Sequence, residues 1–256
     1  MKQAMIFAAG LGTRLKPLTD TMPKALVRVG GQPLLWHVIQ RLKEAGFGRV
    51  VINVHHFAQQ IIDYLQANQN FGLDIRISDE TSGLLETGGG IRKALPLFDP
   101  ELPVLIHNVD ILSNADLAGI YAMAERGHAD ALLLVSPRHT KRYLLFEEEE
   151  STAGASGILL LQGWTNIETG EVRSPYPGLD PRRAQQLAFS GIHVLSPSAF
   201  SILKDMPERF GIIDFYLRYC HNHAFLGKNQ RDLQLLDVGK LDSLDMAEAF
   251  LSIPNR

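Results

Sequence analysis

The sequence has 256 residues, of which 45% are hydrophobic and 21% charged, as is usual for a globular protein with a sizeable core. Its formal net charge of −3 argues against a general nucleic-acid binder, because such proteins carry a surplus of Lys and Arg. No apolar run approaches the roughly 20 residues that span a bilayer, and the N-terminus lacks the apolar length of a signal peptide. We therefore expect a cytoplasmic protein with neither a nucleic-acid nor a membrane partner.

Short apolar runs alternate with longer helix-like stretches through the first half of the chain. The predicted strands are residues 4–9, 50–54, 73–78 and 103–108. The predicted helices that alternate with them are residues 33–46, 57–68, 90–98 and 114–127. Continuous apolar strands, each separated from the next by a helix, indicate a doubly wound α/β fold with a mainly parallel sheet covered on both faces.

The pattern changes from residue 131 onward, where strands follow one another with few helices between them. The predicted strands are residues 131–136, 143–150, 156–162 and 187–196, with a turn at Thr169-Gly170 and a surface loop at 174–186. Helices at 197–205 and 211–219, a strand at 233–238 and a helix at 243–252 follow. We expect a single domain, 1–256, with an antiparallel insertion at approximately 136–195.

The one cysteine and the nine histidines give no sign of a disulfide or a zinc site. Cys220 has no cysteine partner within the chain, which suits a reducing compartment. It follows the amphipathic stretch 212–219, so we interpret it as a core or helix-end residue rather than a nucleophile. The histidines are scattered, and none has the HExxH spacing.

A glycine-rich, basic loop, AAGLGTRLKPLTDTMPKALV at residues 8–27, follows the first predicted strand. Ligands of open parallel sheets bind beyond the carboxyl ends of the strands, where Gly10 and Gly12 lie. Glycine lets the backbone approach a ligand closely, and free amides can cradle phosphate oxygens. Arg14 and Lys24 add two cations. We interpret this loop as a phosphate site, and a solvated surface loop is the alternative.

Two other nucleotide-binding motifs fit this loop less well. The dinucleotide fingerprint GxGxxG requires a third glycine where Leu15 stands, and the strand at 50–54 offers Asn53 and His55 instead of an acidic residue. The P-loop pattern GxxxxGK[ST] is missing from the sequence. Neither motif therefore accounts for the loop, and a phosphate site and a solvated surface loop both stay open at this point.

The stretch AAGLGTRLKPLTDTMPKALVRVGGQPLL resembles the signature of the sugar-1-phosphate nucleotidylyltransferases, also called nucleotide-sugar pyrophosphorylases. The resemblance continues through LETGGGIRKALPLF, NVD at 108–110, FSGIHVLSP and LLDVGKLDSL, and so covers nearly the whole chain. It implies a Rossmann-like nucleotidyltransferase fold with a small antiparallel sugar-binding insertion. It also implies an enzyme that makes an NDP-sugar and pyrophosphate from an NTP and a sugar 1-phosphate.

The resemblance assigns roles by position. Arg14 would stabilise charge on the β- and γ-phosphates, and Lys24 would bridge the attacking phosphate and the α-phosphate. The nucleophile is already an anion, so positioning and charge neutralisation carry the reaction and no Ser, Cys or His base is required. The residues expected to bind the nucleotide are Ala9, Gly10, Leu11, Gly12, Thr13, Glu86, Thr87 and Gly88. Those expected to line the sugar are Asn108, Phe189, Ser190 and Gly191.

Two aspartates are the expected ligands of Mg²⁺, the implied cofactor. Asp110 and Asp237 each end an apolar strand, which places both at the ligand-binding edge of the sheet. Magnesium is held by one or two carboxylates together with substrate phosphates and water. Both positions match the family's metal aspartates, although each side chain could instead cap a following helix.

A second glycine cluster, LLETGGGI at residues 84–91, indicates which branch of the family, and so which substrates, the chain resembles. Three consecutive glycines would let a base or sugar ring lie against the backbone; a poor helix entry is the alternative. The ETGGG form resembles the N-acetylmuramate 1-phosphate uridylyltransferases, so UTP with N-acetylmuramate 1-phosphate is the expected substrate pair. Mannose- or heptose-1-phosphate guanylyl transfer is the alternative within the family. A non-catalytic nucleotide-sensing homologue and a glycosyltransferase are the alternatives of other classes.

The sequence departs from its relatives at one functional position. Many of them carry Glu-Lys-Pro before the last sugar-binding strand, and the lysine grips the sugar phosphate; here the region reads PRRAQQLAFSG. Lys141, Arg142, Arg182 or Arg183 could take that lysine's place. No hexapeptide-repeat region follows the closing helix, so we expect no coupled acetyl transfer. The expected oligomeric state is a monomer or a small homo-oligomer.

Overall fold

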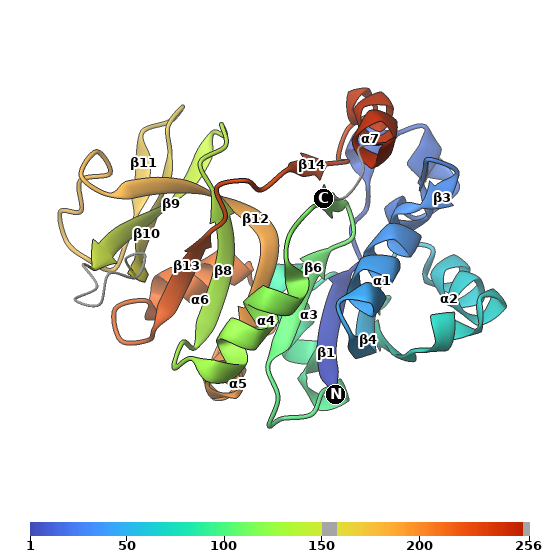
Figure 1. The fold of residues 1–256 in the computed structure, drawn as a ribbon, viewed down its shortest axis with the longest axis horizontal. Helices are drawn as coiled ribbons and strands as arrows, with labels where there is room; N and C mark the ends of the chain where they lie inside the picture. Colours follow the sequence, from blue (N-terminus) through green and yellow to red (C-terminus); the bar gives the residue numbers. More distant parts are fainter. Residues whose placement is uncertain (150–157, 253–256) are drawn as a thin grey trace.

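A computed structural model describes residues 1–149 and 158–252, and a ten-stranded sheet runs through this part of the molecule. The strand order is β11-β10-β13-β8-β12-β6-β1-β4-β5, and β9 pairs with both β10 and β12 (Figure 1). The half that contains β6, β1, β4 and β5 is parallel throughout. Its strands are β1 (Lys2–Phe7), β4 (Phe47–Val54), β5 (Asp74–Asp79) and β6 (Val104–Asn108).

The other half of the sheet is mixed. The long strand β12 (Gln185–Leu195) joins the two halves, because it pairs antiparallel with β6 on one side and with β8 (Ala131–Ser136) on the other. β10 (Ile158–Asn166) pairs antiparallel with β9 (Arg142–Glu149) and with β11 (Glu171–Arg173). The turn between β10 and β11 contains Gly170 with φ +71°, which confirms the predicted turn. Residue 150 and residues 156–157, included in two predicted strands, lie outside the described residues.

Sequence reasoning missed one strand of the main sheet and most of two small ribbons, of which it predicted only the strand at 233–238. β13 (Phe225–Asn229) pairs parallel with β8 and antiparallel with β10. Its sequence FLGKN has no two-residue alternation, so it gave no strand signal. The ribbons are β2 (Arg28–Val29) with β3 (Gln32–Pro33) and β7 (Ile111–Ser113) with β14 (Leu235–Asp237).

Helices cover both faces of the sheet, which confirms the doubly wound α/β class. Alternate residues of β1 show the two faces, since Ala4 and Ile6 belong to one buried cluster and Met5 to the other. The first cluster receives α1 (Leu34–Glu44), α2 (Ala58–Ala67), α4 (Leu117–Arg126) and α7 (Asp242–Ser252). The second receives α3 (Glu86–Ala94), α5 (Pro197–Lys204) and α6 (Ile212–Tyr219). Short 3₁₀ helices are η1 (Thr13–Leu15), η2 (Leu18–Asp20), η3 (Lys24–Leu26), η4 (Gln69–Gly72) and η5 (Leu95–Leu97).

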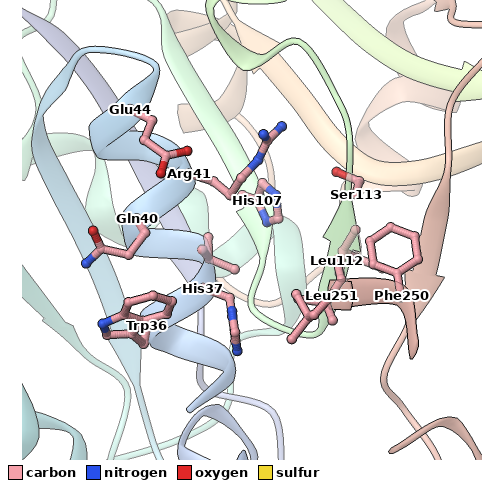
Figure 2. A pocket seen from close by; sticks show the side chains of 12 residues that line it. Trp36, His37, Gln40, Arg41, Glu44, His107, Leu112, Ser113, Phe250 and Leu251 are labelled. Carbon is pink, nitrogen blue, oxygen red and sulfur yellow. The ribbon is translucent and has the colours of Figure 1, made fainter. Parts of the chain in front are cut away.

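A cavity of about 220 Å³ lies between α1, β7 and α7 (Figure 2). Trp36, His37 and Arg41 line it from α1, and Phe250 and Leu251 line it from α7. None of the residues predicted for the nucleotide, sugar or metal sites lines this cavity.

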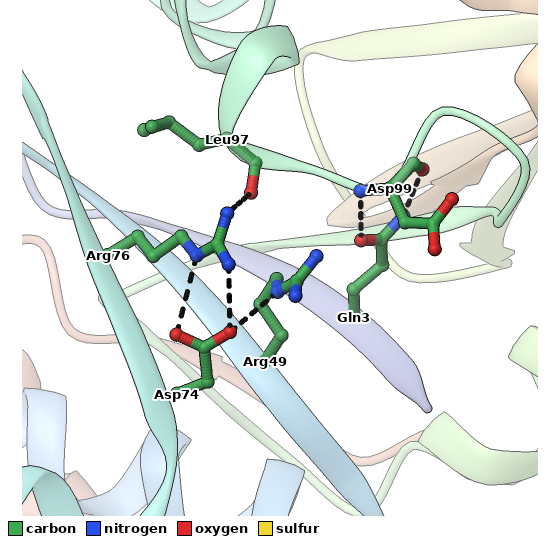
Figure 3. A network of polar contacts seen from close by, with 6 residues as sticks. All are labelled: Gln3, Arg49, Asp74, Arg76, Leu97 and Asp99. Atoms are coloured by element: carbon green, nitrogen blue, oxygen red, sulfur yellow. Dashed lines mark hydrogen bonds and ion pairs between the residues drawn. The ribbon is translucent and has the colours of Figure 1, made fainter.

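Polar contacts tie together the end of the parallel half at which β1 begins (Figure 3). The Gln3 side chain donates to the Asp99 carbonyl at 2.8 Å and accepts from the Asp99 amide at 2.9 Å. The Asp74 carboxylate accepts from Arg49 at 2.7 Å and from Arg76 at 3.2 Å, and these cations lower its pKa, Arg49 first. The polar side chains at this end have protein partners, whereas the opposite end of β1 leads into the glycine-rich loop.

Two further expectations concern Cys220 and membrane spans. Cys220 is the C-terminal cap of α6, and burial raises the pKa of its thiol to about 11. A thiol in that state is not a nucleophile at neutral pH, which agrees with the helix-end interpretation.

Within residues 1–149 and 158–252, every helix is too short or too polar to cross a bilayer.

Candidate functional site

A cavity of about 430 Å³ opens where β1 and β6 end and the glycine-rich loop begins. It gathers side chains and backbone from the loop after β1, from η3, from the start of α3 and from the segment after β6. Most of the residues predicted for nucleotide binding and catalysis line it, together with one predicted sugar residue, Asn108, and one predicted metal ligand, Asp110, whereas Gly88 and Asp237 do not. The predicted residues that line it are Ala9, Gly10, Leu11, Gly12, Thr13, Arg14, Lys24, Glu86, Thr87, Asn108 and Asp110.

The loop after β1 is folded so that its amides remain available. Gly12 adopts φ +64°, and a Cβ there would lie 2.8 Å from Thr19 Cγ2 and 3.1 Å from Lys24 Cβ, so this position requires glycine. The Gly12 carbonyl accepts from the Thr19 hydroxyl and from the Leu15 amide, each at 2.8 Å. Within the described ranges, the amides of residues 10–12 donate no hydrogen bond. These free amides can bind phosphate oxygens.

Lys24 and Asp110 form an ion pair at the wall of the cavity. Lys24 is 7% exposed, so the pair holds the cation in place rather than leaving it solvated. The Asp110 carbonyl accepts from the Val238 amide at 2.8 Å, which connects the segment after β6 to the segment after β14. A cation fixed in this way is suited to stabilising negative charge that develops in a reaction.

The β7–β14 ribbon brings Asp237 next to this pair, because Asp237 faces Ile111, the residue after Asp110. Burial raises the pKa of Asp237, and the negative charge of Asp110 raises it further, against the positive charges of Lys24, Arg14 and Arg138. A Cβ placed on Gly239 would lie 2.7 Å from Asp237 Oδ1 and 2.8 Å from Arg14 Nη2. The Asp237 carboxylate therefore lies beside the Arg14 guanidinium, although Asp237 itself is exposed and does not line the cavity.

Asp110 and Asp237 fit a hard divalent cation. They are two neighbouring carboxylates whose mutual repulsion a cation would relieve, and their oxygens are the ligand type that Mg²⁺ prefers. The described residues contain no cluster of three or more His, Cys, Asp or Glu side chains around one point. A metal here would therefore complete its coordination with substrate phosphates and water.

The start of α3 is tied to the segment before α6. Glu86 adopts φ +63°, a conformation in which L residues are rare, and its carboxylate accepts from Arg209 Nε at 3.0 Å. The Thr87 hydroxyl accepts from the Ile212 amide at 2.9 Å. Both residues thus line the cavity with their side chains already held by neighbouring protein groups.

These observations agree with the comparison with known proteins. Residues 3–146 match the sequence model of the family described as "Nucleotidyl transferase". The chain belongs to this family. The match covers the loop after β1, Lys24, the start of α3 and Asp110, which are the groups that meet in the cavity.

Relatives and solved structures support the predicted resemblance. The nucleotidyl transferase is 50% identical over 261 residues to an N-acetylmuramate alpha-1-phosphate uridylyltransferase of Caulobacter vibrioides, covering 98% of this chain and 97% of the relative. A protein of that name from Neisseria meningitidis serogroup B is 44% identical over 142 residues, covering 54% of this chain and 61% of the relative. A crystal structure of UDP-glucose pyrophosphorylase complexed with UDP-glucose shares the fold, with TM-score 0.76, 16% identity and 98% of each chain covered.

The three glycines of α3 pack against protein atoms. A Cβ on Gly88 would lie 2.1 Å from the Phe210 ring, and a Cβ on Gly89 would lie 2.3 Å from the Glu208 carbonyl oxygen. A Cβ on Gly90 would lie 2.8 Å from Glu80 Oε1. Gly88 is outside the cavity lining, and its amide donates to the Phe210 carbonyl at 2.9 Å. The cluster thus allows α3 to approach its neighbours closely.

The predicted sugar residues of β12 lie beside Asn108 but do not line the cavity themselves. Gly191 adopts φ +77°, and a Cβ there would be 2.7 Å from Asn108 Nδ2. The Ser190 hydroxyl is buried and accepts from the Ile192 amide at 3.1 Å. The Phe189 carbonyl accepts from Arg138 Nη2 at 3.0 Å. The close approach of Gly191 thus brings the β12 backbone next to Asn108, which lines the cavity.

Of the basic residues that could replace the family's sugar-phosphate lysine, three have contacts elsewhere. Lys141 pairs with Glu168 at 2.8 Å, Arg182 pairs with Asp180 at 3.0 Å, and Arg183 lines a different cavity. For Arg142, which begins β9, the structure gives no contact with the site. Arg138, which the sequence did not single out, is exposed, and its charge acts on Asp237.

Sequence reasoning also missed two buried polar residues that line the cavity, Asn53 and Glu80. Asn53 is 1% exposed and Glu80 is 0% exposed. An asparagine inside the apolar run VVINV was the available signal, since a buried polar side chain requires hydrogen-bond partners.

Proposed function

We propose that this nucleotidyl transferase transfers a uridylyl group from UTP to N-acetylmuramate 1-phosphate and releases pyrophosphate. The observation that carries the proposal is the 50% identity to the Caulobacter uridylyltransferase over 98% of the chain. The cavity supports it independently, because free loop amides, two cations and the Asp110 carboxylate line it, and the charges of Asp110, Lys24 and Arg14 act on nearby Asp237.

Each group in the cavity has a role in this reaction. An oxygen of the sugar phosphate attacks the α-phosphorus of UTP, and the bond to the departing pyrophosphate breaks without any proton transfer. The amides of residues 10–13 bind the triphosphate, and Arg14 neutralises the charge that develops on pyrophosphate. Lys24, oriented by Asp110, lies between the attacking phosphate and the α-phosphate. Catalysis then consists of positioning and electrostatic stabilisation.

Asp110 and Asp237 would hold the Mg²⁺ ion that nucleotidyl transfer requires. Bound there, the ion would neutralise phosphate charge and polarise the α-phosphate. The chain's own contribution is to keep the two carboxylates adjacent, which the β7–β14 ribbon and the Val238 amide do. Lys24 pairs with Asp110, and the Arg14 guanidinium lies beside Asp237.

The sugar 1-phosphate would lie between Asn108 and the segment Phe189, Ser190 and Gly191. Arg138 would bind its phosphate in place of the family's lysine, because it is held at the Phe189 carbonyl and acts on Asp237. An arginine suits this task, since its planar fork can bind a phosphate through two hydrogen bonds. The antiparallel strands of residues 136–195 would form the sugar side of a single domain. We place the enzyme in the cytoplasm, as a monomer or small homo-oligomer.

A matrix of four NTPs against a panel of sugar 1-phosphates tests the proposal. Pyrophosphate release should depend on UTP, on N-acetylmuramate 1-phosphate and on Mg²⁺, and EDTA should abolish it. Turnover with GTP and mannose or heptose 1-phosphate would favour the guanylyltransferase alternative. Binding of nucleotide without pyrophosphate release from any pair would favour a non-catalytic nucleotide sensor.

A further inference from the structure

A chain of buried hydrogen bonds links the glycine-rich loop to the start of α3. Asn53 Oδ1 accepts from the amides of Ala8 and Ala9, at 2.7 and 3.3 Å. Asn53 Nδ2 donates to Glu80 Oε1 at 2.7 Å. Glu80 Oε2 accepts from the Leu85 amide at 3.1 Å, directly before α3 begins. The loop that precedes Gly10 and the helix that carries Glu86 are thus connected through two side chains.

The direction of every bond in this chain is fixed by chemistry. The amides of Ala8 and Ala9 can only donate, so Asn53 must present its oxygen to them and its nitrogen to Glu80. Glu80 then faces two donors, Asn53 Nδ2 and the Leu85 amide, one at each oxygen. A carboxylate can accept both, whereas an amide of the same shape would place its NH₂ group against one of these donors.

Close packing keeps this chain in place. Asn53 and Glu80 are both almost fully buried, so an unpaired polar group here would have no water to replace its partner. Gly90 leaves room for the pair, because a Cβ there would lie 2.8 Å from Glu80 Oε1 and 3.3 Å from Asn53 Nδ2. His55 Nδ1 lies 2.7 Å from the Glu80 carbonyl oxygen and holds the backbone of that residue.

We infer that Asn53 and Glu80 are positioning residues that hold the free amides of residues 10–12 in the geometry that binds a triphosphate. This inference rests on the proposed nucleotidyl transfer and deepens it. The polar atoms of both side chains already have protein hydrogen-bond partners, so their effect on the phosphates passes through the backbone of Ala8 and Ala9. The pair also couples this loop to the helix start that lines the other side of the cavity.

Exchanging the amide and the carboxylate between positions 53 and 80 tests the inference. Asn53→Asp alone places two carboxylates against each other, and Glu80→Gln alone places donor against donor. In the double variant the aspartate accepts from the Ala8 and Ala9 amides and from the new glutamine NH₂ group, while the glutamine oxygen accepts from the Leu85 amide. Each single variant should lose about 100-fold in kcat/KM, as expected for misplaced binding groups. The double variant should recover most of this loss.

Binding of inorganic triphosphate, measured by calorimetry with Mg²⁺, separates loop positioning from recognition of the base. The single variants should bind it more weakly than the wild type, and the double variant should recover. Single variants that lose affinity for UTP but retain it for inorganic triphosphate would overturn the inference. So would a folded double variant that binds as weakly as the single variants. A wild type that binds triphosphate but shows no turnover would refute the proposed reaction. The comparison of triphosphate affinities among the Asn53 and Glu80 variants would still test the positioning role.

Gly90→Ala provides a second route that leaves both side chains unchanged. The added methyl would displace the Glu80 carboxylate, so affinity for inorganic triphosphate should fall. Gly83→Ala is the matched control, because a Cβ at Gly83 has no atom within 4 Å. Equal triphosphate affinities for these two alanine variants, both folded by circular dichroism, would contradict the inference.

Discussion

Two buried histidines should make the enzyme sensitive to mild acid. His107 on β6 and His193 on β12 are 3% and 2% exposed, and burial lowers their pKa values from 6.5 to about 4 and about 3. The two strands are paired and carry Asn108 and Gly191 of the proposed sugar site. Protonation of either histidine therefore opposes the packing on which that site depends.

The sign and size of the effect follow from these values. Between pH 6.5 and the lowered pKa, the unfolded chain binds a proton that the folded protein does not, so stability falls as the pH falls. Moving from roughly pH 7.5 to about pH 5 should cost about 2 kcal/mol for each histidine, or about 4 kcal/mol for both. This loss is large relative to a typical free energy of unfolding of about 5–15 kcal/mol.

Urea unfolding at the two pH values, followed by circular dichroism, measures the effect. His193→Gln keeps a group able to bond to Tyr216 but removes the titration, so it should reduce the acid-induced loss by about half. His128→Gln, at an exposed position, is the control and should leave the loss unchanged. If the wild type and His193→Gln lose equal stability on acidification, the assignment to buried neutral histidine is wrong.

Three further predictions concern the site. Lys24→Ala should lower kcat by about 100- to 1,000-fold without preventing folding, and wild-type turnover in steady-state assays would remove Lys24 from the mechanism. Gly88→Ala should lower the free energy of unfolding by about 1–3 kcal/mol, because its methyl would overlap the Phe210 ring, while Gly83→Ala should change it little in urea titrations. Arg138→Ala should raise KM for the sugar 1-phosphate about tenfold and leave KM for UTP unchanged; the opposite pattern would place Arg138 at the nucleotide.

Much of the fold could be predicted because its strands are buried on both faces. Runs such as VVINV and PVLIHN are apolar at successive positions, and each is followed by a helix with its own apolar stripe. The glycines and cations predicted a phosphate site in the loop after β1, and the family resemblance predicted roles for this loop and for the two aspartates. Apolar runs, helix periodicity and short motifs each depend on residues close together in the sequence, so they can be recognised without knowing the fold.

What could not be predicted depends on contacts between distant segments. β13 contains a glycine and a lysine and becomes a strand only because β8 and β10 flank it. The packing of Gly88 under Phe210 and the placement of Arg138 depend on where α6 and β12 lie. The Asn53–Glu80 chain joins three separate segments, and no local pattern specifies its partners.

A crystal structure with UTP and Mg²⁺ tests the central claim most directly. The account predicts triphosphate density against the amides of residues 10–13, with a metal ion between the phosphates and the carboxylates of Asp110 and Asp237. A triphosphate bound elsewhere, for example in the cavity between α1, β7 and α7, with the loop after β1 left empty, would contradict it.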